Sequence, residues 1–317
     1  MSWLRWAAVR VARLVAALLI SSFVIFSAAS LAPGSPLAAL SNGRTLPPEQ
    51  QAQLRERFHL DDPFLLRYVK WLGNAIRGDF GISIASRDEV SRLISGRIWI
   101  TGQLVLYASV LILVVGIGLG LLAGIRRGAA DSSVLVATAL LAAVPAFVAA
   151  TLLTILFVTE LGWFPALGEG DGLGGRIEHL TLPAIALAMS SIAIVARVTR
   201  AAVRDEFGRE HVQTAESRGI PRRQLIRRHV VRNAAVPITT VSGLTVASLF
   251  ALSAIVERAF SLNGLGSYLV KAAGTKDIAV VQGISMVIVV AFVVVNLLVD
   301  VCYLILDPRI RTSGSAR

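Results

Sequence analysis

The chain has 317 residues, of which 55% are hydrophobic and only 16% charged, and its mean hydropathy is +0.70. A soluble domain has about 45–50% apolar and about 25% charged residues, so this composition excludes most soluble enzymes. The single cysteine, Cys302, excludes an intramolecular disulfide and a cysteine-based zinc or iron–sulfur site. The net charge of +11 is typical of a protein that binds nucleic acid or a membrane, and the positions of the charges decide between the two.

Six apolar runs are each long enough, at about 20 residues, to cross a bilayer as a helix. They cover residues 9–32, 100–125, 134–159, 180–199, 236–256 and 278–306. The first run has the charged start and small-residue end of a cleaved signal peptide, but it is longer than a typical signal sequence core of about 7–15 residues, so we expect it to be retained. The sequence therefore predicts an all-α polytopic membrane protein with six transmembrane helices.

The charges predict the orientation of these helices. With the N-terminus inside, the cytoplasmic segments hold eighteen of the 31 Lys and Arg residues, and the outer segments balance thirteen cations against thirteen acids. The positive-inside rule then places both termini in the cytoplasm. The basic charge is thus a signal of topology, and a nucleic-acid partner is not needed to explain it.

The spans divide the chain into three parts. Residues 1–33 form the cytoplasmic N-terminus and first transmembrane helix, residues 34–99 an extracytoplasmic helical segment, and residues 100–317 a five-helix core. The core includes a long cytoplasmic loop at about 200–237, between the fourth and fifth spans.

The extracytoplasmic segment is expected to hold three helices. The first runs from Pro47 to about Phe58, and the third begins near Asp88. The second has Asp62 as its N-cap and Pro63 as its first residue. This second helix has one apolar face, which lies at the membrane interface or packs against its own protein.

Glycines and prolines in the spans predict close helix packing and kinks. Gly116, Gly120 and Gly124 recur at a spacing of four, which places them on one face of the second span. We interpret this face as a site of close helix packing in preference to the lining of a pathway. Pro145 in the third span and Pro183 in the fourth are candidate kinks.

Polar residues in the last two spans suggest two roles. Asp300 lies near the inner end of the sixth span, and we expect it to pair with Arg197 or with an arginine of residues 222–232. Ser242, Thr245 and Ser248 lie broadly on one face of the fifth span. They are candidates for the lining of a translocation path, although hydroxyls of this kind also bond back to their own helix.

The cytoplasmic loop is polar but has a helical pattern. Residues 204–207 and 213–216 favour helix, Gly219-Ile220-Pro221 favours a break, and residues 222–233 resume a helical pattern. The sequence therefore predicts a helix–turn–helix on the cytoplasmic face. Such a basic amphipathic pair lies on anionic lipid or docks on a partner protein.

The residues of this loop match a known pattern. The pattern consists of residues 210–219 followed by His229, Arg232, Asn233 and Pro237, and matching stretches occur at residues 60–81, 257–283 and 298–311. Together they resemble the permeases of bacterial ABC importers, whose cytoplasmic "EAA" loop has this form. The likeness is to the dipeptide, oligopeptide and nickel branch, and within it to the B-type first permease subunit. It covers nearly the whole chain and implies a type I importer permease architecture.

The resemblance implies which residues couple the chain to the ATPases that drive transport. They are Gln213, Thr214, Ala215, Glu216, Ser217, Arg218 and Gly219. Gln213 stands where the motif has glutamate, so charge pairing is not expected at this position. The implied partners are a second homologous permease, two cytoplasmic ATPase subunits or domains that bind ATP and magnesium, and an extracytoplasmic substrate-binding protein.

The chain itself is expected to hold no cofactor and no metal and to catalyse no reaction. The resemblance implies a multi-pass location in the bacterial cytoplasmic membrane and import of di- or oligopeptides. Nickel chelates, heme or another peptide-sized solute are the alternative cargo. A membrane scaffold or a channel that does not use ATP is the alternative from another class, and it would not require the cytoplasmic helix–turn–helix.

Overall fold

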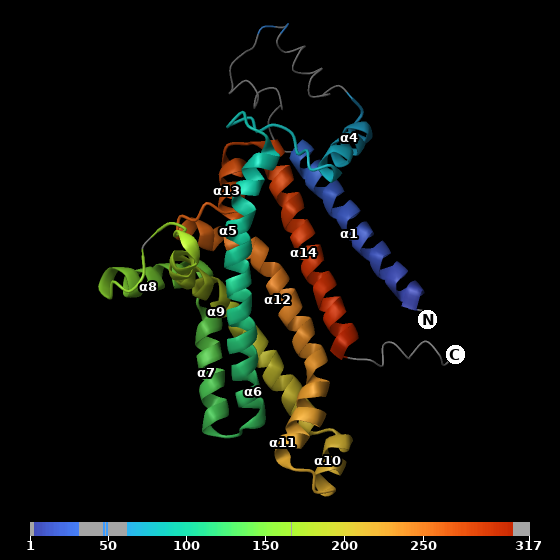
Figure 1. Ribbon diagram of the computed structural model, residues 1–317, viewed down its shortest axis with the longest axis vertical. Helices are drawn as coiled ribbons and strands as arrows, with labels where there is room; N and C mark the ends of the chain where they lie inside the picture. Colours follow the sequence, from blue (N-terminus) through green and yellow to red (C-terminus); the bar gives the residue numbers. More distant parts are fainter. Residues whose placement is uncertain (1–2, 32–46, 48, 50–61, 166, 307–317) are drawn as a thin grey trace.

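The computed structural model describes residues 3–31, 47, 49, 62–165 and 167–306 and is drawn in Figure 1. In these residues the chain is helical, and its extended pairing is limited to an isolated bridge between Ile82 and Glu89. The elements are α1 (Trp3–Leu31), α4 (Phe64–Ile76), α5 (Val90–Leu111), η1 (Ile112–Gly116), α6 (Ile117–Ile125), α7 (Ala129–Ala143), α8 (Ala146–Leu153), η2 (Thr154–Glu160), α9 (Gly172–Phe207), α10 (Glu210–Ser217), α11 (Arg222–Leu225), η3 (Ile226–Val231), α12 (Arg232–Ala259), α13 (Leu265–Gly274) and α14 (Ile278–Leu306). The all-α fold predicted from the sequence is confirmed.

Five continuous helices of the described residues are long and apolar enough to cross a membrane. They are Ala8–Leu31, Val90–Ile125, Gly172–Phe207, Arg222–Ala259 and Ile278–Cys302. They match the first, second, fourth, fifth and sixth predicted spans. The second, fourth and fifth continue well beyond the apolar runs, because polar residues extend each helix into water at one or both ends.

The third predicted span, 134–159, is not one straight helix. α7 and the continuous pair α8 and η2 meet at an angle of 98°, with the break at Val144 and Pro145. Proline has no N–H to donate, and its ring clashes with the preceding turn, so α7 ends before it. With this bent pair taken as one span the total is six. Pro183 behaves differently, because α9 continues through it.

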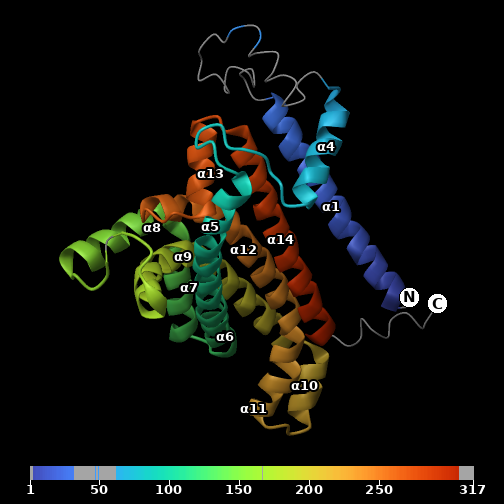
Figure 2. The same cartoon turned by 45° about the horizontal axis from the view of Figure 1, so that its top comes forward.

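The ends of most spans gather at two opposite ends of the molecule. The start of α1, the end of α14 and the α10–α11 hairpin lie toward one end of the molecule, whereas α4 and α13 lie toward the other (Figures 1 and 2). This arrangement agrees with the alternation of spans predicted from the charges.

α9 lies at the centre of the bundle, and the glycines of the second span let it come close. A Cβ on Gly120 would lie 2.4 Å from Thr199 Cβ, and one on Gly124 would lie 2.7 Å from a methyl carbon of Val203. A Cβ on Gly116 would meet Val195 at 3.2 Å. The predicted packing role of these three glycines is confirmed.

The aromatic face of α4 packs on α1. Phe64 and Tyr68 lie against Phe23 and Phe26, with ring centroids 5.2–6.0 Å apart, and Trp71 also contacts Phe26. The other side of α4 leaves Leu65, Leu66 and Val69 exposed. The first predicted helix of this segment, from Pro47 to about Phe58, lies outside the described residues.

Two local predictions need correction. α4 begins at Phe64 with Pro63 as its N-cap, one residue later than expected, and the Asp62 carboxylate accepts a hydrogen bond from Lys70 Nζ instead of capping the helix.

Asp300 pairs with Arg10 of α1 and not with an arginine of the cytoplasmic loop. α1 packs along α14, so Arg10 reaches Asp300 directly. α5 begins at Val90 with Glu89 as its N-cap, close to where a helix was expected.

Candidate functional site

The loop between α9 and α12 folds as the predicted helix–turn–helix. α10 packs against the end of α9, and after a turn at residues 218–221 the chain enters α11, which continues through η3 into α12. An apolar cluster holds these elements together. Its buried members are Val203, Val212, Ala215, Leu225, Val230, Ala234 and Ile238. The hairpin is therefore packed against both spans that it joins.

Gly219 has the backbone conformation that its position predicts. Its φ is +76°, in the left-handed region that favours glycine. The N–H of Gly219 donates to the carbonyl of Glu216, and the N–H of Ile220 donates to the carbonyl of Ala215. These bonds close the C-terminus of α10. In the described part of the chain, no atom beyond its own neighbours lies within 4 Å of where a Cβ of Gly219 would stand, so the constraint is on the backbone and not on space.

The seven residues expected to contact an ATPase do not share one environment. Ala215 is buried in the apolar cluster beneath the hairpin. The others are exposed, and they are Gln213, Thr214, Glu216, Ser217, Arg218 and Gly219. A partner that docks on the hairpin would therefore meet these six, whereas Ala215 would set the distance between α10 and α9.

Gln213 uses its side-chain amide within the loop. Its Nε2 donates to the carbonyl oxygen of Gly208, 3.3 Å away, at the end of α9. An ionised glutamate at this position has no hydrogen to donate and could not make this bond. The glutamine that departs from the EAA pattern thus joins α10 to the residue that follows α9.

A polar network that the sequence did not single out joins three helices. His211 Nε2 lies 3.0 Å from Glu206 Oε1 at the end of α9 and 3.1 Å from Asn233 Nδ2 at the start of α12. Asn233 also donates to the carbonyl of His229. The signal that could have found this contact is the matched pattern itself, which holds both His211 and Asn233.

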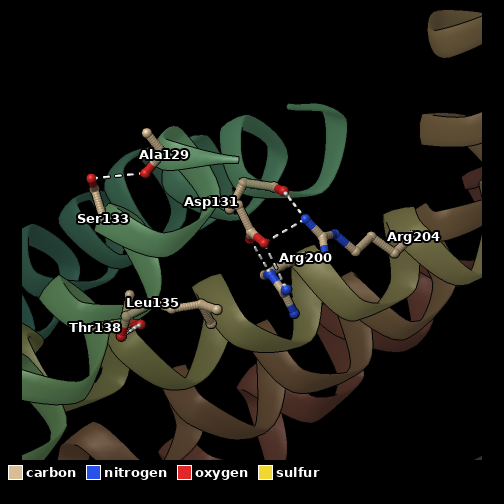
Figure 3. Close-up of polar contacts among 8 residues, drawn as sticks. Ala129, Asp131, Ser133, Leu135, Thr138, Arg200 and Arg204 are labelled. Atoms are coloured by element: carbon tan, nitrogen blue, oxygen red, sulfur yellow. Dashed lines mark hydrogen bonds and ion pairs between the residues drawn. The ribbon is translucent and has the colours of Figure 1, made fainter. Parts of the chain in front are cut away.

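An ion-pair cluster fixes the α6–α7 turn to α9, as Figure 3 shows. Asp131 Oδ1 lies 2.5 Å from Arg200 Nε, and Asp131 Oδ2 lies 2.6 Å from Arg204 Nη2. Arg204 also donates to the carbonyl of Ala123 in α6. α9 is thereby held to α6 and α7 just before it leads into the coupling hairpin.

The three candidate path residues lie inside this chain. Ser242 and Thr245 are only 5% and 8% exposed, and Ser248 is partly buried. Ser248 donates to the carbonyl of Thr245 in its own helix, whereas Ser242 Oγ is buried and has no hydrogen-bond partner among the residues that the structure describes. The neighbouring Gly243 lies against Val299 of α14. This face of α12 therefore meets protein in the present conformation.

Two buried acidic side chains, Asp277 and Glu257, accept hydrogen bonds from other elements at the opposite end of the bundle. Asp277 Oδ2 accepts hydrogen bonds from Ser83 Oγ at 2.5 Å and from the N–H of Ala85 at 3.1 Å. The fully buried Glu257 accepts from Thr101 Oγ1 and from the N–H of Ser267. These bonds were not predicted, because Ser83, Ala85 and Thr101 each lie more than 150 residues from the acid that they bind.

Comparison with known proteins gives a consistent result. Residues 116–312 match the family described as "Binding-protein-dependent transport system inner membrane component". A Brucella abortus chain that carries a peptide transport system permease name is 36% identical over 306 residues, which cover 95% of this chain and 97% of that one. The oligopeptide transport system permease protein AppB of Bacillus subtilis is 34% identical, with 92% and 93% covered.

A solved structure shares the fold. A chain from the inward-facing MetNI methionine ABC transporter superposes with a TM-score of 0.53 at 15% identity, covering 68% of this chain and 96% of that chain. At this identity the likeness concerns the fold alone.

Proposed function

Because the chain belongs to the family of binding-protein-dependent transport system inner membrane components, we propose that it is a permease subunit of an ATP-driven peptide importer. The family is one of transport subunits and not of enzymes, and the chain is a multi-pass protein of the bacterial cytoplasmic membrane. Di- or oligopeptides are the proposed cargo, because relatives from Brucella abortus, Bacillus subtilis and Escherichia coli carry peptide transport names.

The single observation that carries the coupling proposal is the α10–α11 hairpin. It presents exposed polar residues to one side and buries Val212 and Ala215 against α9 and α12 on the other. A partner that moves the hairpin would therefore move the ends of two spans with it. Two cytoplasmic ATPases, which bind ATP and magnesium, would supply this motion by closing on each other.

The remaining partners follow from the same proposal. A second homologous permease would form the other wall of the path, and an extracytoplasmic binding protein would deliver the peptide. Ser242, Thr245 and Ser248 remain the proposed path residues. Since they are buried in the present conformation, they would line the path only in a state in which α12 separates from its neighbours.

Site-specific cross-linking tests the docking of the ATPases. In a Cys302→Ser background, single cysteines replace Thr214 and Ser217, which are both exposed on the hairpin. We expect both to form adducts with the ATPase subunits in membranes that contain the whole transporter. A cysteine at Lys276, exposed between α13 and α14, is the matched control and should give no such adduct, because α13 lies toward the end of the molecule opposite the hairpin (Figure 1). Absence of an ATPase adduct from both hairpin positions, with and without ATP, would contradict the proposal.

A further inference from the structure

The ring nitrogen Nε2 of His211 in α10 lies between a hydrogen-bond acceptor and a hydrogen-bond donor. The acceptor is the carboxylate of Glu206, whose Oε1 is 3.0 Å away near the end of α9. The donor is the side-chain amide nitrogen of Asn233, which is 3.1 Å away near the start of α12. A ring nitrogen carries either a hydrogen or a lone pair, so Nε2 can satisfy only one of these two neighbours at a time.

The amide group of Asn233 cannot remove this conflict by turning over. Its Nδ2 also donates to the carbonyl oxygen of His229, 2.8 Å away. A carbonyl oxygen only accepts, so this bond fixes the position of the amide nitrogen and leaves its second hydrogen for His211. An ionised Glu206 likewise has only oxygens to offer. Through Nε2, His211 therefore binds either Glu206 or Asn233.

The protonation state of His211 decides which neighbour it binds. The charged ring carries a hydrogen on both nitrogens, so Nε2 has no lone pair for Asn233 and forms a charge-assisted bond to Glu206. Only a neutral ring, with its hydrogen on Nδ1, accepts from Asn233. Histidine is the side chain type that changes its charge between about pH 5 and 8. The His211 side chain is 45% exposed, so protons from water reach it.

No other cation lies as close to Glu206 among the residues that the structure describes. Glu206 is buried, and its second carboxylate oxygen, Oε2, lies 3.9 Å from Arg209 Nε. The Arg209 side chain is 67% exposed, so water screens this pair. The neighbouring titratable side chains form no hydrogen bond or ion pair with a described residue, and they are Asp205, Glu210, His229 and Arg232. The charge of His211 therefore dominates at this contact.

We propose that His211 is a pH-sensitive link whose charge decides whether α10 is bonded to α9 or to α12. At low pH the charged ring binds Glu206 and releases Asn233, and at higher pH the neutral ring accepts from Asn233. The consequence for transport rests on the proposed function, which places the path residues in α12. Loss of the bond to α12 should weaken the coupling of ATP hydrolysis to peptide uptake as the cytoplasm becomes acidic.

The melting temperature of the purified transporter tests the link at about pH 5.5 and about pH 8, on either side of the range in which histidine titrates. Glu206→Gln removes the charge that the protonated ring binds, so it should lower the melting temperature by roughly 2 °C more at the lower pH. Asn233→Leu removes the amide donor, so it should lower the melting temperature more at the higher pH. In a His211→Gln background both differences should disappear, because glutamine does not titrate and can both donate and accept. Differences that persist in this background would overturn the inference.

Peptide uptake per ATP hydrolysed provides the second measurement, in proteoliposomes whose ATPase side is held at each pH. We expect this ratio to fall at least about twofold at the lower pH for the wild-type chain, which is the effect of losing one hydrogen bond, and to stay level for His211→Gln. His229→Gln, a matched change of a histidine on the same side of the membrane, should keep the fall. Equal pH dependence of wild type and His211→Gln would overturn the inference. If the wild-type transporter takes up no peptide at any pH, the proposed function fails, whereas the melting temperatures still test the link.

Discussion

Thr101 of α5 donates a hydrogen bond to Oε1 of Glu257 in α12, with 2.7 Å between the two oxygens, and both residues are buried. The hydroxyl oxygen of Thr101 accepts the N–H of Leu265, and Glu257 Oε2 accepts the N–H of Ser267, each at 2.8 Å. Leu265 and Ser267 lie in the first turn of α13, where backbone N–H groups have no partner within the helix. The pair therefore caps α13 and joins it to two spans.

Replacement of Glu257 should detach this cap. Glu257→Ala leaves the Ser267 N–H without its acceptor in a buried site, at a cost of about 1–3 kcal/mol for the unsatisfied group. Glu257→Gln keeps one carbonyl oxygen for the same N–H and should cost less. We expect the melting temperature of the purified transporter to fall more for alanine than for glutamine. Equal melting temperatures for wild type and Glu257→Ala would show that the cap does not stabilise the fold.

The pair between Arg10 and Asp300 should hold α1 to α14. Asp300 is buried, so Arg10→Ala would leave its carboxylate without this partner, at a cost of about 3 kcal/mol. The double variant Arg10→Met, Asp300→Leu removes both charges and should restore much of the lost stability, because a buried pair is replaceable by apolar groups. Membrane yield and melting temperature measure both effects. A double variant no better than Arg10→Ala would count against this account.

Two glycines only two residues apart, on different faces of α6, offer a test of the contact with α9. A Cβ at Gly120 would lie 2.4 Å from Thr199 Cβ, whereas one at Gly118 would meet no described residue within 4 Å. Gly120→Ala should therefore destabilise the chain by about 1–3 kcal/mol through overpacking. Gly118→Ala should be neutral or slightly stabilising, since alanine favours helix over glycine. Similar melting temperatures for the two variants would disprove the close approach.

Coupling between the hairpin and the ATPases should depend on the left-handed backbone conformation of Gly219. A residue other than glycine in the left-handed region costs about 1–2 kcal/mol, and asparagine visits that region more readily than a β-branched residue. We expect Gly219→Val to reduce peptide uptake and ATPase recovery strongly, and Gly219→Asn to reduce them less. Membrane levels of the chain control for insertion. If valine and asparagine behave alike, the conformation of the turn is not what the position requires.

The spans were predictable because hydropathy is a local property of the sequence. Each of the five continuous spans contains one apolar run, and Gly219-Ile220-Pro221 was identified as a break, where the structure has its turn. The close packing of Gly120 was also predictable, since a periodic row of small residues has few other uses in a membrane helix.

Contacts between distant residues were not predictable in the same way. The partner of Asp300 is 290 residues away, and the interpretation from sequence chose arginines that are nearer along the chain. Pro145 indicated a kink, but the bend of 98° depends on how α8 packs against α9 and α12. Ala215 was grouped with its exposed neighbours because the motif is contiguous, whereas the helix turns this one side chain inward.

The face of α12 that holds Ser242, Thr245 and Ser248 should open during transport if it lines the path. In a Cys302→Ser background, cysteines at these positions are tested with a small, water-soluble thiol reagent. Because Ser242 and Thr245 are buried in the present conformation, we expect their cysteines to be protected in this state and to react in one other state of the ATP cycle. A cysteine at Thr214, exposed on the hairpin, controls for reagent activity when the ATPases are absent. Protection of all three positions in every state, with and without ATP and peptide, would show that this face packs permanently against protein, and the path would then belong to other spans.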